Sequence, residues 1–352
     1  MAKLKIAVLY GGRSSEHEVS IHSAAAVAQT LSAKYEVIKI LITRQGLWFL
    51  QDEGPAPAGG RPLTPVIMSD ANLQTFDGQK LKADVFFPVL HGTMGEDGSM
   101  QGLFEILGAP YAGCGVLTSA LGMDKELCKL LASFYGVPIV PYIKLEASDK
   151  YKDEELEAAV LKLGYPLFVK PMSLGSSIGV SKVDGPKRLK GALAQAFRYE
   201  DAVLIEKGIA DAREIFCGVV GCDDKIHTSL CGELKALNGE FFDYKAKYEA
   251  PGGCDMIIPA DIPQAAQDKM RIAAHDIFRA LRGQGLARAD FLMDARGNFY
   301  FSEINTMPGM SESSLFPNLW KSSKKTYEDI LDILIHLALK RGQARGAHSL
   351  ER

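Results

Sequence analysis

The sequence predicts an α/β domain with a parallel sheet, followed by a longer region of mixed α+β structure. Residues 4–10 are apolar except for Lys5, and this run stops at Gly11 and Gly12, as a buried parallel strand does. Strand-like and helix-like segments alternate up to about residue 120, which favours a parallel sheet with helices on its faces. Strands predominate after residue 213. Because 352 residues are too many for one ordinary core, we expect more than one domain.

The first predicted domain covers residues 1–120, and the second covers residues 121–212. The first contains strands 4–10, 36–42 and 83–90 and an alanine-rich helix 19–32. Residues 52–65 are rich in proline and glycine, which is typical of a loop. In the second domain we expect helices 124–135, 152–163 and 186–199, and strands 139–144, 167–170 and 202–206. Pro141 places strand 139–144 at a sheet edge, because proline cannot donate to a ladder.

The third predicted domain covers residues 213–341 and is dominated by strands. Its expected elements are strands 214–220, 229–235, 287–293 and 298–304, and helices 263–281 and 327–340. The tail, residues 342–352, is polar and small, and we expect it to be disordered.

Composition excludes several classes of protein. The formal charge is -3, and no cluster of positive charge indicates a nucleic-acid or membrane partner. No apolar run approaches the ~18 residues of a membrane span. The six cysteines include no CxxC pair, so we expect reduced, mostly buried thiols in a cytoplasmic protein.

A loop containing Gly175, Ser176, Ser177 and Gly179 follows the strand that ends near Lys170. Glycines let the backbone turn tightly and present N–H groups to phosphate oxygens, while the serine hydroxyls add donors and the lysine adds charge. Taken alone, the segment is equally compatible with a phosphate-binding loop and with a flexible β-hairpin turn.

Asp290, Glu303 and Asn305 lie on two apolar strands that a short turn connects. Glu303 and Asn305 are two residues apart and therefore face the same side of a strand, opposite which Asp290 can lie. Two carboxylates and an amide oxygen are hard ligands that suit magnesium bridging nucleotide phosphates. A solvated strand face fits less well, because both strands are otherwise apolar. Arg288 shares the face of Asp290, where it can stabilise an oxyanion or pair with a carboxylate.

Further polar residues end or follow strands. Gly309 offers a backbone N–H without a side chain, and Ser314 can bind a carboxylate or cap a helix. Glu206 and Lys207 end one strand and Glu214 opens the next. These three can hydrogen-bond an adenine edge and a ribose, although an exposed strand end is the simpler interpretation of them alone.

Glu16 lies in residues 14–18, directly after the first strand, and His91 opens the loop 91–99 after the third. Ligands of open α/β sheets bind beyond the carboxyl ends of the strands, so these two loops should meet. Glu16 is also compatible with a helix-start acid that the helix dipole stabilises. His91 has no second histidine at ligand spacing, which argues against a metal there.

Seven segments in this order resemble the D-alanine–D-alanine ligases, a family of the ATP-grasp superfamily. They extend over residues 4 to about 340, and each is individually weak. The segments are GGRSSEHEVS (11–20), HGTMGEDGSMQG (91–102), MDK (123–125), VKPMSLGSSIGV (169–180), FFDYKAKY (241–248), ARADF (287–291) and EINTMPGMSESSLFP (303–317).

The resemblance implies an N-terminal α/β domain followed by a two-part ATP-grasp fold that holds ATP between its parts. It implies that ATP phosphorylates one D-alanine, whose acyl phosphate the amine of a second D-alanine attacks. The dipeptide would serve peptidoglycan synthesis in a walled bacterium. The implied cofactors are ATP and two Mg²⁺ ions, for which Mn²⁺ can substitute. The implied assembly is a cytoplasmic homodimer with no nucleic-acid or membrane partner.

The resemblance also implies roles for individual residues. It implies that the ATP phosphates are bound by Lys125, Lys170 and Ser177. It implies a further nucleotide contact from Lys247, on a mobile loop of about residues 238–254. It places adenine and ribose at Glu206, Lys207 and Glu214, and two magnesium ions at Asp290, Glu303 and Asn305. Its amino-acid residues are Glu16 at the first ammonium, Arg288 and the Gly309 N–H at the tetrahedral intermediate, Ser314 at the second carboxylate, and Ser176, Tyr248 and Glu16 as a hydrogen-bonded triad.

Two residues depart from the family pattern. Ala212 replaces a usual glycine, and Gly208 stands where a bulky residue is common, so the adenine contacts are expected to differ in detail. A sibling activity that makes a D-alanyl-D-lactate ester is disfavoured by Tyr248, because ester-forming relatives have phenylalanine there. An inactive nucleotide-binding module is disfavoured because the metal carboxylates and Arg288 are all present.

Overall fold

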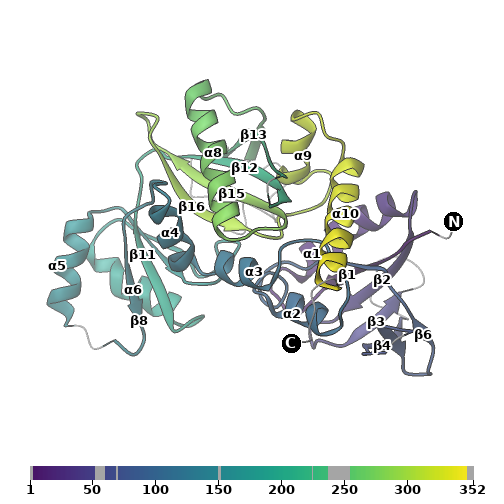
Figure 1. The fold of residues 1–352 in the computed structure, drawn as a ribbon. Helices are drawn as coiled ribbons and strands as arrows, with labels where there is room; N and C mark the ends of the chain where they lie inside the picture. Colours follow the sequence, from purple (N-terminus) through teal and green to yellow (C-terminus); the bar gives the residue numbers. More distant parts are fainter. Residues whose placement is uncertain are drawn as a thin grey trace, which may run out of the picture.

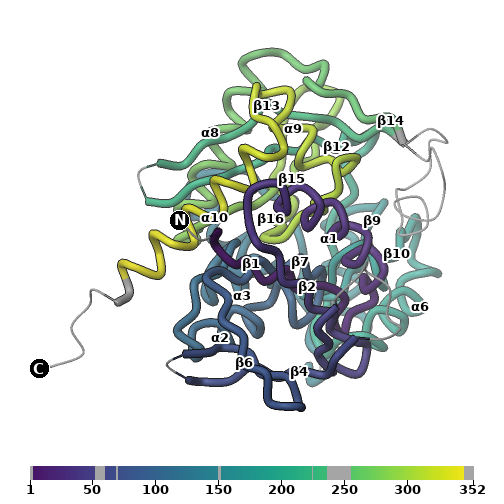
Figure 2. Tube along the Cα trace, turned by 90° about the vertical axis from the view of Figure 1, so that its right-hand side faces the viewer, coloured from purple at the N-terminus to yellow at the C-terminus, as the bar shows by residue number. Residues whose placement is uncertain are grey.

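The computed structural model describes residues 3–51, 60–68, 70–149, 152–223, 225–236 and 254–346. The described chain forms three lobes, each built around one β-sheet (Figure 1). Seen from the side in Figure 2, the N-terminal and C-terminal sheets are stacked and the central lobe lies beside them. Each predicted domain range contains one of these sheets, and the domain limits themselves stay predictions.

The N-terminal sheet has a parallel centre and an antiparallel extension. β1 (Lys5–Gly11) lies between β2 (Glu36–Ile42) and β7 (Val85–Val89), and it is parallel to both. The extension continues beyond β2 as β3 (Trp48–Gln51), β4 (Arg61–Pro65), β5 (Leu73–Thr75) and β6 (Lys80–Leu81). The prediction of a parallel sheet is therefore confirmed for the centre of this sheet, and its four short antiparallel strands were not predicted.

Both faces of β1 are buried from Ile6 onward, as its apolar run predicts. Ile6 and Val8 point into a core shared with helix α1 (His17–Ser32), while Ala7 and Leu9 point into a core on the opposite face. The second core contains α2 (Ser99–Ile106) through Phe104. The alternation follows the two-residue period of a strand.

The predicted loop 52–65 is wrong at its end, because residues 61–65 form β4. Leu63 is buried and pairs with β3 and β5, so the burial of this side chain outweighs the local turn signal of Pro62 and Pro65. Residues 52–59 lie outside the described part of the chain.

The central lobe holds a four-stranded antiparallel sheet in the order β10-β9-β11-β8. Its core is made by two helices against the sheet, and its buried residues all come from this lobe. Its elements are α3 (Val116–Met123) and α4 (Lys125–Phe134), which lead into it, then β8 (Tyr142–Glu146), α5 (Asp153–Leu163), β9 (Leu167–Pro171), β10 (Ser181–Val183), α6 (Pro186–Ala196) and β11 (Ala202–Lys207). β8 is an edge strand, as Pro141 predicts, although it begins at Tyr142.

The C-terminal sheet is antiparallel in the order β14-β13-β12-β15-β16. α8 covers one face and α9 packs on the other. Its elements are β12 (Arg213–Cys222), β13 (Lys225–Ala236), β14 (Cys254–Ile257), α8 (Gln264–Ala280), β15 (Gly285–Met293), β16 (Phe299–Asn305), α9 (Leu315–Ser322) and α10 (Tyr327–Gly346). Short helices α2 and α3 were not predicted, whereas Ser314 stands at the N-cap of α9, in line with the helix-cap interpretation of that residue.

α10 joins the first and last lobes. Leu331 and Ile335 share one apolar core with Val8 and Val27 of the N-terminal domain and Trp320 of α9. In Figure 1 the helix, drawn in yellow, runs between the two sheets. The prediction of a disordered tail is wrong for residues 342–346, which continue α10, and residues 347–352 lie outside the described part.

No helix among the described residues is long and apolar enough to cross a membrane. The five cysteines whose side chains are described, namely Cys114, Cys128, Cys217, Cys222 and Cys231, are buried and free. This confirms the prediction of buried, unbridged cysteines for those five.

Candidate active site

The loops after β1 and β7 meet at Glu16, as the strand order predicts. A Cβ at Gly92 would lie 2.9 Å from Glu16 Oε2 and 2.7 Å from Ser14 Oγ, and Gly92 has a φ of +75°. Only glycine therefore allows the second loop to pass so close to the carboxylate without strain. Glu16 is buried at the start of α1, its side chain does not cap that helix, and its carboxylate lies beside the loop at Gly92.

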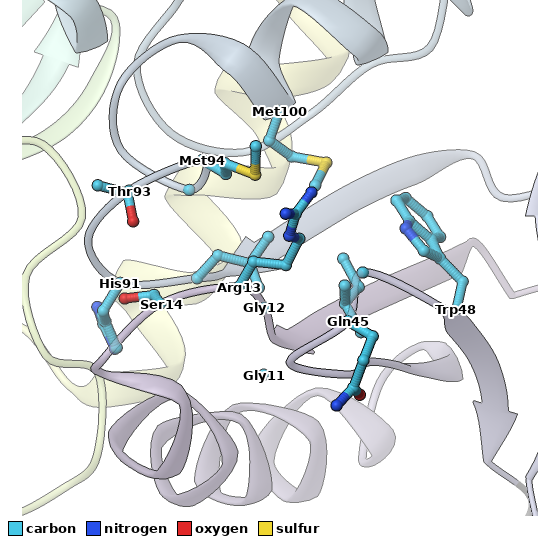
Figure 3. A pocket seen from close by; sticks show the side chains of 14 residues that line it. Gly11, Gly12, Arg13, Ser14, Gln45, Trp48, His91, Thr93, Met94 and Met100 are labelled. Atoms are coloured by element: carbon cyan, nitrogen blue, oxygen red, sulfur yellow. The ribbon is translucent and has the colours of Figure 1, made fainter.

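Beside this meeting point a cavity of about 240 Å³ opens at the carboxyl ends of β1, β2 and β7. Figure 3 shows His91 and Ser14 on one side of the cavity and Trp48 on the other, with Arg13 between them. Its position agrees with the rule that open α/β sheets bind ligands where their strands end.

The Gly/Ser loop of the central lobe reaches the same carboxylate. Ser176 Oγ donates a hydrogen bond to Glu16 Oε1, so a residue of the central lobe contacts a residue 160 positions earlier in the chain. Ser176 and Ser177 have φ values of +52° and +59°. Two adjacent non-glycine residues in the left-handed region are costly, and such conformations cluster at functional sites. The loop joins antiparallel β9 and β10, so it is also a hairpin connection.

Two lysines flank this loop. Lys125 Nζ donates to the Leu174 carbonyl oxygen at 2.6 Å and lies 3.9 Å from Glu303 Oε2. Burial lowers the pKa of Lys125 despite the nearby carboxylates. Lys170, on β9, is held by Glu206, with Nζ 2.6 Å from Oε2. Burial disfavours the charged form of Lys170, but the negative charge of Glu206 favours it more strongly. Glu303 and Glu214 act in the same direction, so the pKa of Lys170 is raised.

Glu206 has a second lysine partner that the sequence analysis missed. Lys129 Nζ lies 2.9 Å from Glu206 Oε1, and the lysine side chain is fully buried. Burial disfavours the carboxylate, but Lys129 and Lys170 together outweigh it and lower the pKa of Glu206 to about 2. The spacing of the lysines could have indicated this. Lys129 lies four residues after Lys125, so both are on the face of α4 that also carries Cys128 and Ala132, and this face is buried.

The predicted metal residues come together on β15 and β16. Asp290 is registered opposite Glu303, and Arg288 opposite Asn305. Arg288 binds Asp290 through two hydrogen bonds, Nε to Oδ1 at 2.7 Å and Nη2 to Oδ2 at 2.6 Å. The Arg288 guanidinium also lies over the Phe216 ring, 5.2 Å from its centroid. Arg288 therefore pairs with a carboxylate, as one interpretation of the sequence holds, and this pairing keeps it in the cluster where the other interpretation, oxyanion stabilisation, would need it.

These donors fit a magnesium site by their chemistry, because two carboxylates and an amide are the oxygen ligands that Mg²⁺ prefers. Among the described residues no group of three His, Cys, Asp or Glu side chains could hold a metal alone. The proposed set has two carboxylates, and its third donor is the Asn305 amide. Asn305 Oδ1 accepts the Met307 N–H at 3.0 Å, which orients the amide.

The segment after β16 connects these residues to the N-terminal domain. His91 Nδ1 lies 2.9 Å from the Met307 carbonyl oxygen. A Cβ at Gly309 would lie 3.0 Å from Ser314 Oγ, so the backbone of Gly309 and the hydroxyl of Ser314 are neighbours. Ser314 Oγ in turn lies 2.7 Å from Ser311 Oγ.

Glu96 was also missed as a site residue. It is buried beside His91, with Oε1 3.6 Å from Nδ1. Burial raises the pKa of Glu96 to about 7; Glu16 adds to the rise, while His91 opposes it. Glu96 belongs to the motif segment 91–102, but sequence spacing does not show that it is enclosed.

Other predicted residues lie farther out or cannot be placed. Lys207 is exposed at the end of β11, and Glu214 is half-buried on β12. Lys247 and Tyr248, and residues 238–253 of the predicted mobile loop, lie outside the described part of the chain. Their roles stay predictions.

Comparison with known proteins gives one consistent result. Two family models match the chain, "D-ala D-ala ligase N-terminus" over residues 5–114 and "D-ala D-ala ligase C-terminus" over residues 131–336. The D-alanine–D-alanine ligase of Thermoanaerobacter sp. (strain X514) is 43% identical, over 97% of this chain and 98% of that protein. D-alanine–D-alanine ligase A of Salmonella typhimurium (strain LT2) is 38% identical, over 99% of both.

Solved structures agree with the sequence relatives. The D-alanine–D-alanine ligase of Coxiella burnetii has a TM-score of 0.86 at 33% identity, covering 98% of this chain and 97% of that one. The VanG D-Ala:D-Ser ligase of Enterococcus faecalis has a TM-score of 0.84 at 34% identity, covering 96% and 99%. The three-lobed arrangement is thus that of an ATP-grasp ligase.

Proposed function

The chain belongs to the D-alanine–D-alanine ligase family, and from this premise we propose that it uses ATP to join two D-alanines for a peptidoglycan precursor. The observation that carries the proposal is the convergence of all three lobes. Ser176 of the central lobe bonds Glu16 of the N-terminal lobe, and Lys125 lies beside Glu303 of the C-terminal lobe.

The reaction has two steps. A carboxylate oxygen of the first D-alanine attacks the γ-phosphorus of ATP, which releases ADP and forms an acyl phosphate. The neutral amine of the second D-alanine then attacks the acyl carbon, and the tetrahedral intermediate collapses with loss of phosphate. The second ammonium loses one proton before attack, and the nitrogen loses another as the amide forms.

We assign the nucleotide to the space between the central and C-terminal lobes. Lys125, Lys170 and Ser177 bind its phosphates, since they surround a loop whose N–H groups can serve an anion. Phosphoryl transfer depends on positioning and charge neutralisation more than on covalent help, which suits lysines. Adenine and ribose are assigned to Glu206, Lys207 and Glu214, and Lys247 to the phosphates.

We assign two magnesium ions to Asp290, Glu303 and Asn305, with manganese as a possible substitute. Magnesium bound there would neutralise phosphate charge during transfer. Arg288 forms an ion pair with Asp290. Arg288 is therefore held within reach of the position where negative charge develops on the acyl oxygen, together with the Gly309 N–H.

The amino acids are assigned to residues near the N-terminal lobe. Glu16 binds the first ammonium, and Ser314 binds the second carboxylate. Ser176, Glu16 and Tyr248 form the proposed triad, in which the Ser176–Glu16 bond supplies one of the two links. An acyl phosphate is destroyed by water, so contact between lobes also protects the intermediate.

A second candidate differs in the second substrate. The similarity to a D-Ala:D-Ser ligase at 34% identity favours testing D-serine as acceptor. Tyr248 argues against the ester-forming activity with D-lactate. Replacing Tyr248 with Phe should raise the share of D-alanyl-D-lactate in product mixtures, and an unchanged share at every pH would remove Tyr248 as the selector.

The test is ADP release coupled to product identification by mass spectrometry. Purified protein should release ADP only with ATP, magnesium and D-alanine together, and the product should be D-alanyl-D-alanine. D-Serine, D-lactate and L-alanine are offered singly and with D-alanine. Turnover on L-alanine equal to that on D-alanine would contradict the assignment, and a dominant D-alanyl-D-serine product would favour the second candidate.

We also propose a cytoplasmic homodimer, by analogy with the family. Light scattering should give twice the mass of one 38.3 kDa chain, and a monomer mass at assay concentration would contradict the dimer.

A further inference from the structure

Lys129 is a fully buried cation next to the proposed nucleotide site. Its side chain has no exposed surface, so no substrate can reach it. Its ammonium lies 2.9 Å from Glu206 Oε1 and donates to the Ser302 carbonyl oxygen at 2.8 Å. A lysine in such a place is rarely a packing residue, because burying an ammonium is costly unless it is paired. The pairing therefore needs a functional or structural reason.

The Glu206 side chain is also almost completely buried. The carboxylate is 3% exposed and lies between two ammonium groups, Lys129 at Oε1 and Lys170 at Oε2. The two lysines differ in access, because Lys170 is 16% exposed whereas Lys129 is fully covered. Of the pair, only Lys170 is therefore able to turn from the carboxylate toward a ligand.

The proposed function asks Lys170 to bind a phosphate of ATP. If Lys170 were the sole partner of Glu206, moving it would leave a buried carboxylate with no counter-ion. Breaking a buried ion pair in this way is strongly unfavourable. With Lys129 in place, Glu206 keeps one cation throughout, and Lys170 can be shared with the phosphate.

We propose that Lys129 is a positioning residue that acts as the permanent counter-ion of Glu206, which frees Lys170 to bind the ATP phosphates. The inference rests on the proposed use of ATP and adds a residue that does not itself touch the nucleotide. The bond from Lys129 to Ser302 also ties α4 to β16, one residue before Glu303. Lys129 thus connects the phosphate-binding lysine with the strand that carries the metal carboxylate.

The test is ATP binding by calorimetry to wild type and to Lys129→Met. We expect at least a tenfold loss of ATP affinity, while adenosine affinity, measured by displacement of a fluorescent nucleotide, changes less than threefold. The difference arises because Lys129 acts through Lys170 on the phosphates. Equal losses for ATP and adenosine would overturn the inference, because a purely structural lysine would affect both. Unchanged ATP affinity in a folded variant would overturn it as well.

Lys144→Met is the matched control. It removes a lysine from the same lobe that pairs with Glu126 and Glu146 away from the phosphate loop. ATP affinity within twofold of wild type is expected. If this variant loses ATP affinity as much as Lys129→Met does, the effect is general to lysine removal and the inference fails.

A double variant separates counter-ion action from packing. The loss of ATP affinity caused by Lys129→Met is therefore measured in wild type and again in the Glu206→Gln background, so that any direct contribution of Glu206 to nucleotide binding cancels. Because Glu206→Gln leaves no buried carboxylate to neutralise, the loss should be at least fivefold smaller in that background. A packing role predicts the same loss in both backgrounds, which would overturn the inference. If Lys129→Met does not fold, Lys129→Gln takes its place in both comparisons, since its amide still donates to Ser302.

The two proposals fail in different ways. Wild-type protein that binds ATP but releases no ADP with D-alanine contradicts the ligase assignment, while the Lys129 comparison still holds. Normal turnover in wild type with normal ATP affinity in Lys129→Met contradicts only the role of Lys129.

Discussion

At the scale of single residues, the candidate site is organised by paired charges. Arg288 holds Asp290 through two bonds, and Glu206 lies between Lys129 and Lys170. Paired charges of this kind keep a site in place at a lower desolvation cost than isolated ones. They also set side chains near their working positions, which reduces reorganisation during the reaction.

Glu303→Gln should abolish turnover and leave the fold intact. A neutral amide weakens divalent-metal binding and leaves phosphate charge unbalanced, so a loss of at least ~100-fold in kcat is expected. Asp268→Asn, an exposed carboxylate on α8, is the control and should be near wild type. Near-normal activity of Glu303→Gln with an unchanged melting curve would remove Glu303 from the metal site.

Glu96 predicts a pH dependence of stability. Its pKa is raised from 4.5 to about 7 when folded, so the unfolded chain loses this proton first as the pH rises. The stabilisation is complete below pH 4.5 and is lost as the pH rises toward about 7. At about 1.4 kcal/mol per pKa unit, the loss is up to about 3 kcal/mol.

Glu96→Gln keeps the neutral form at every pH. Denaturant unfolding should show equal stability of variant and wild type near pH 5, and a more stable variant at pH 8. If the difference in stability between variant and wild type stays constant across this range, Glu96 is not protonated in the folded protein.

At the scale of elements, the site is built from loops that leave strand ends. The segment 91–99 passes Glu16 so closely that Gly92 has no room for a side chain, and the Gly/Ser loop after β9 reaches the same carboxylate. Such loops tolerate strained backbone because the sheets beneath them are rigid.

Gly92→Ala tests this close approach. The new Cβ would lie 2.7 Å from Ser14 Oγ and would also require a left-handed alanine, so Glu16 should be displaced. We expect kcat/KM for D-alanine to fall at least ~10-fold, equivalent to roughly 1.4 kcal/mol.

Gly108→Ala is its matched control. Gly108 also has a positive φ, +61°, but its Cβ would meet nothing within 4 Å. It should carry the backbone strain without the clash, and therefore lose stability but not substrate affinity. Equal kinetic losses in both variants would attribute the effect to strain rather than to the position of Glu16.

At the scale of the whole molecule, the first and last lobes are joined and the central lobe has its own core. α10 contributes to the core of the N-terminal sheet, whereas the central core contains residues of that lobe alone. The joined lobes form a fixed frame for Glu16 and Arg288, against which the central lobe presents Ser176 and Lys170.

Arg341 secures this frame. Its guanidinium lies 3.9 Å from the centroid of the Tyr111 ring and donates to the Gly113 and Tyr111 carbonyl oxygens. Arg341→Ala should lower the free energy of unfolding by about 2–3 kcal/mol, since two carbonyls lose a charged donor and the ring loses a cation. Urea unfolding measures the change.

Lys340→Ala is the neighbouring control. Lys340 is 63% exposed and makes a 3.8 Å surface pair with Asp223, so its removal should cost less than about 0.5 kcal/mol. Equal effects of the two substitutions would show that α10 is not anchored through Arg341.

Much of the fold is readable from local patterns. Residues 4–10 and 36–42 read as buried strands, and the long helix 263–281 reads as α8, because their periodicity is uninterrupted. The four short strands β3–β6 are not readable, because pairing with neighbouring strands, rather than a period in their own sequence, defines them. In β4 the two prolines predict a loop, and the strand forms because it pairs with β3 and β5.

By itself the sequence determined which chemical groups the protein has and which strand ends carry them. Motif, alternation and the family resemblance together predict six site residues, namely Glu16, Ser176, Arg288, Asp290, Glu303 and Asn305. Only the tertiary structure decided which groups are enclosed and paired. Lys129 and Glu96 are ordinary charged residues in the sequence, and they become functional candidates because packing removes them from water. Burial and counter-ions come from segments more than a hundred positions apart, such as Ser176 with Glu16, and no local pattern records that distance.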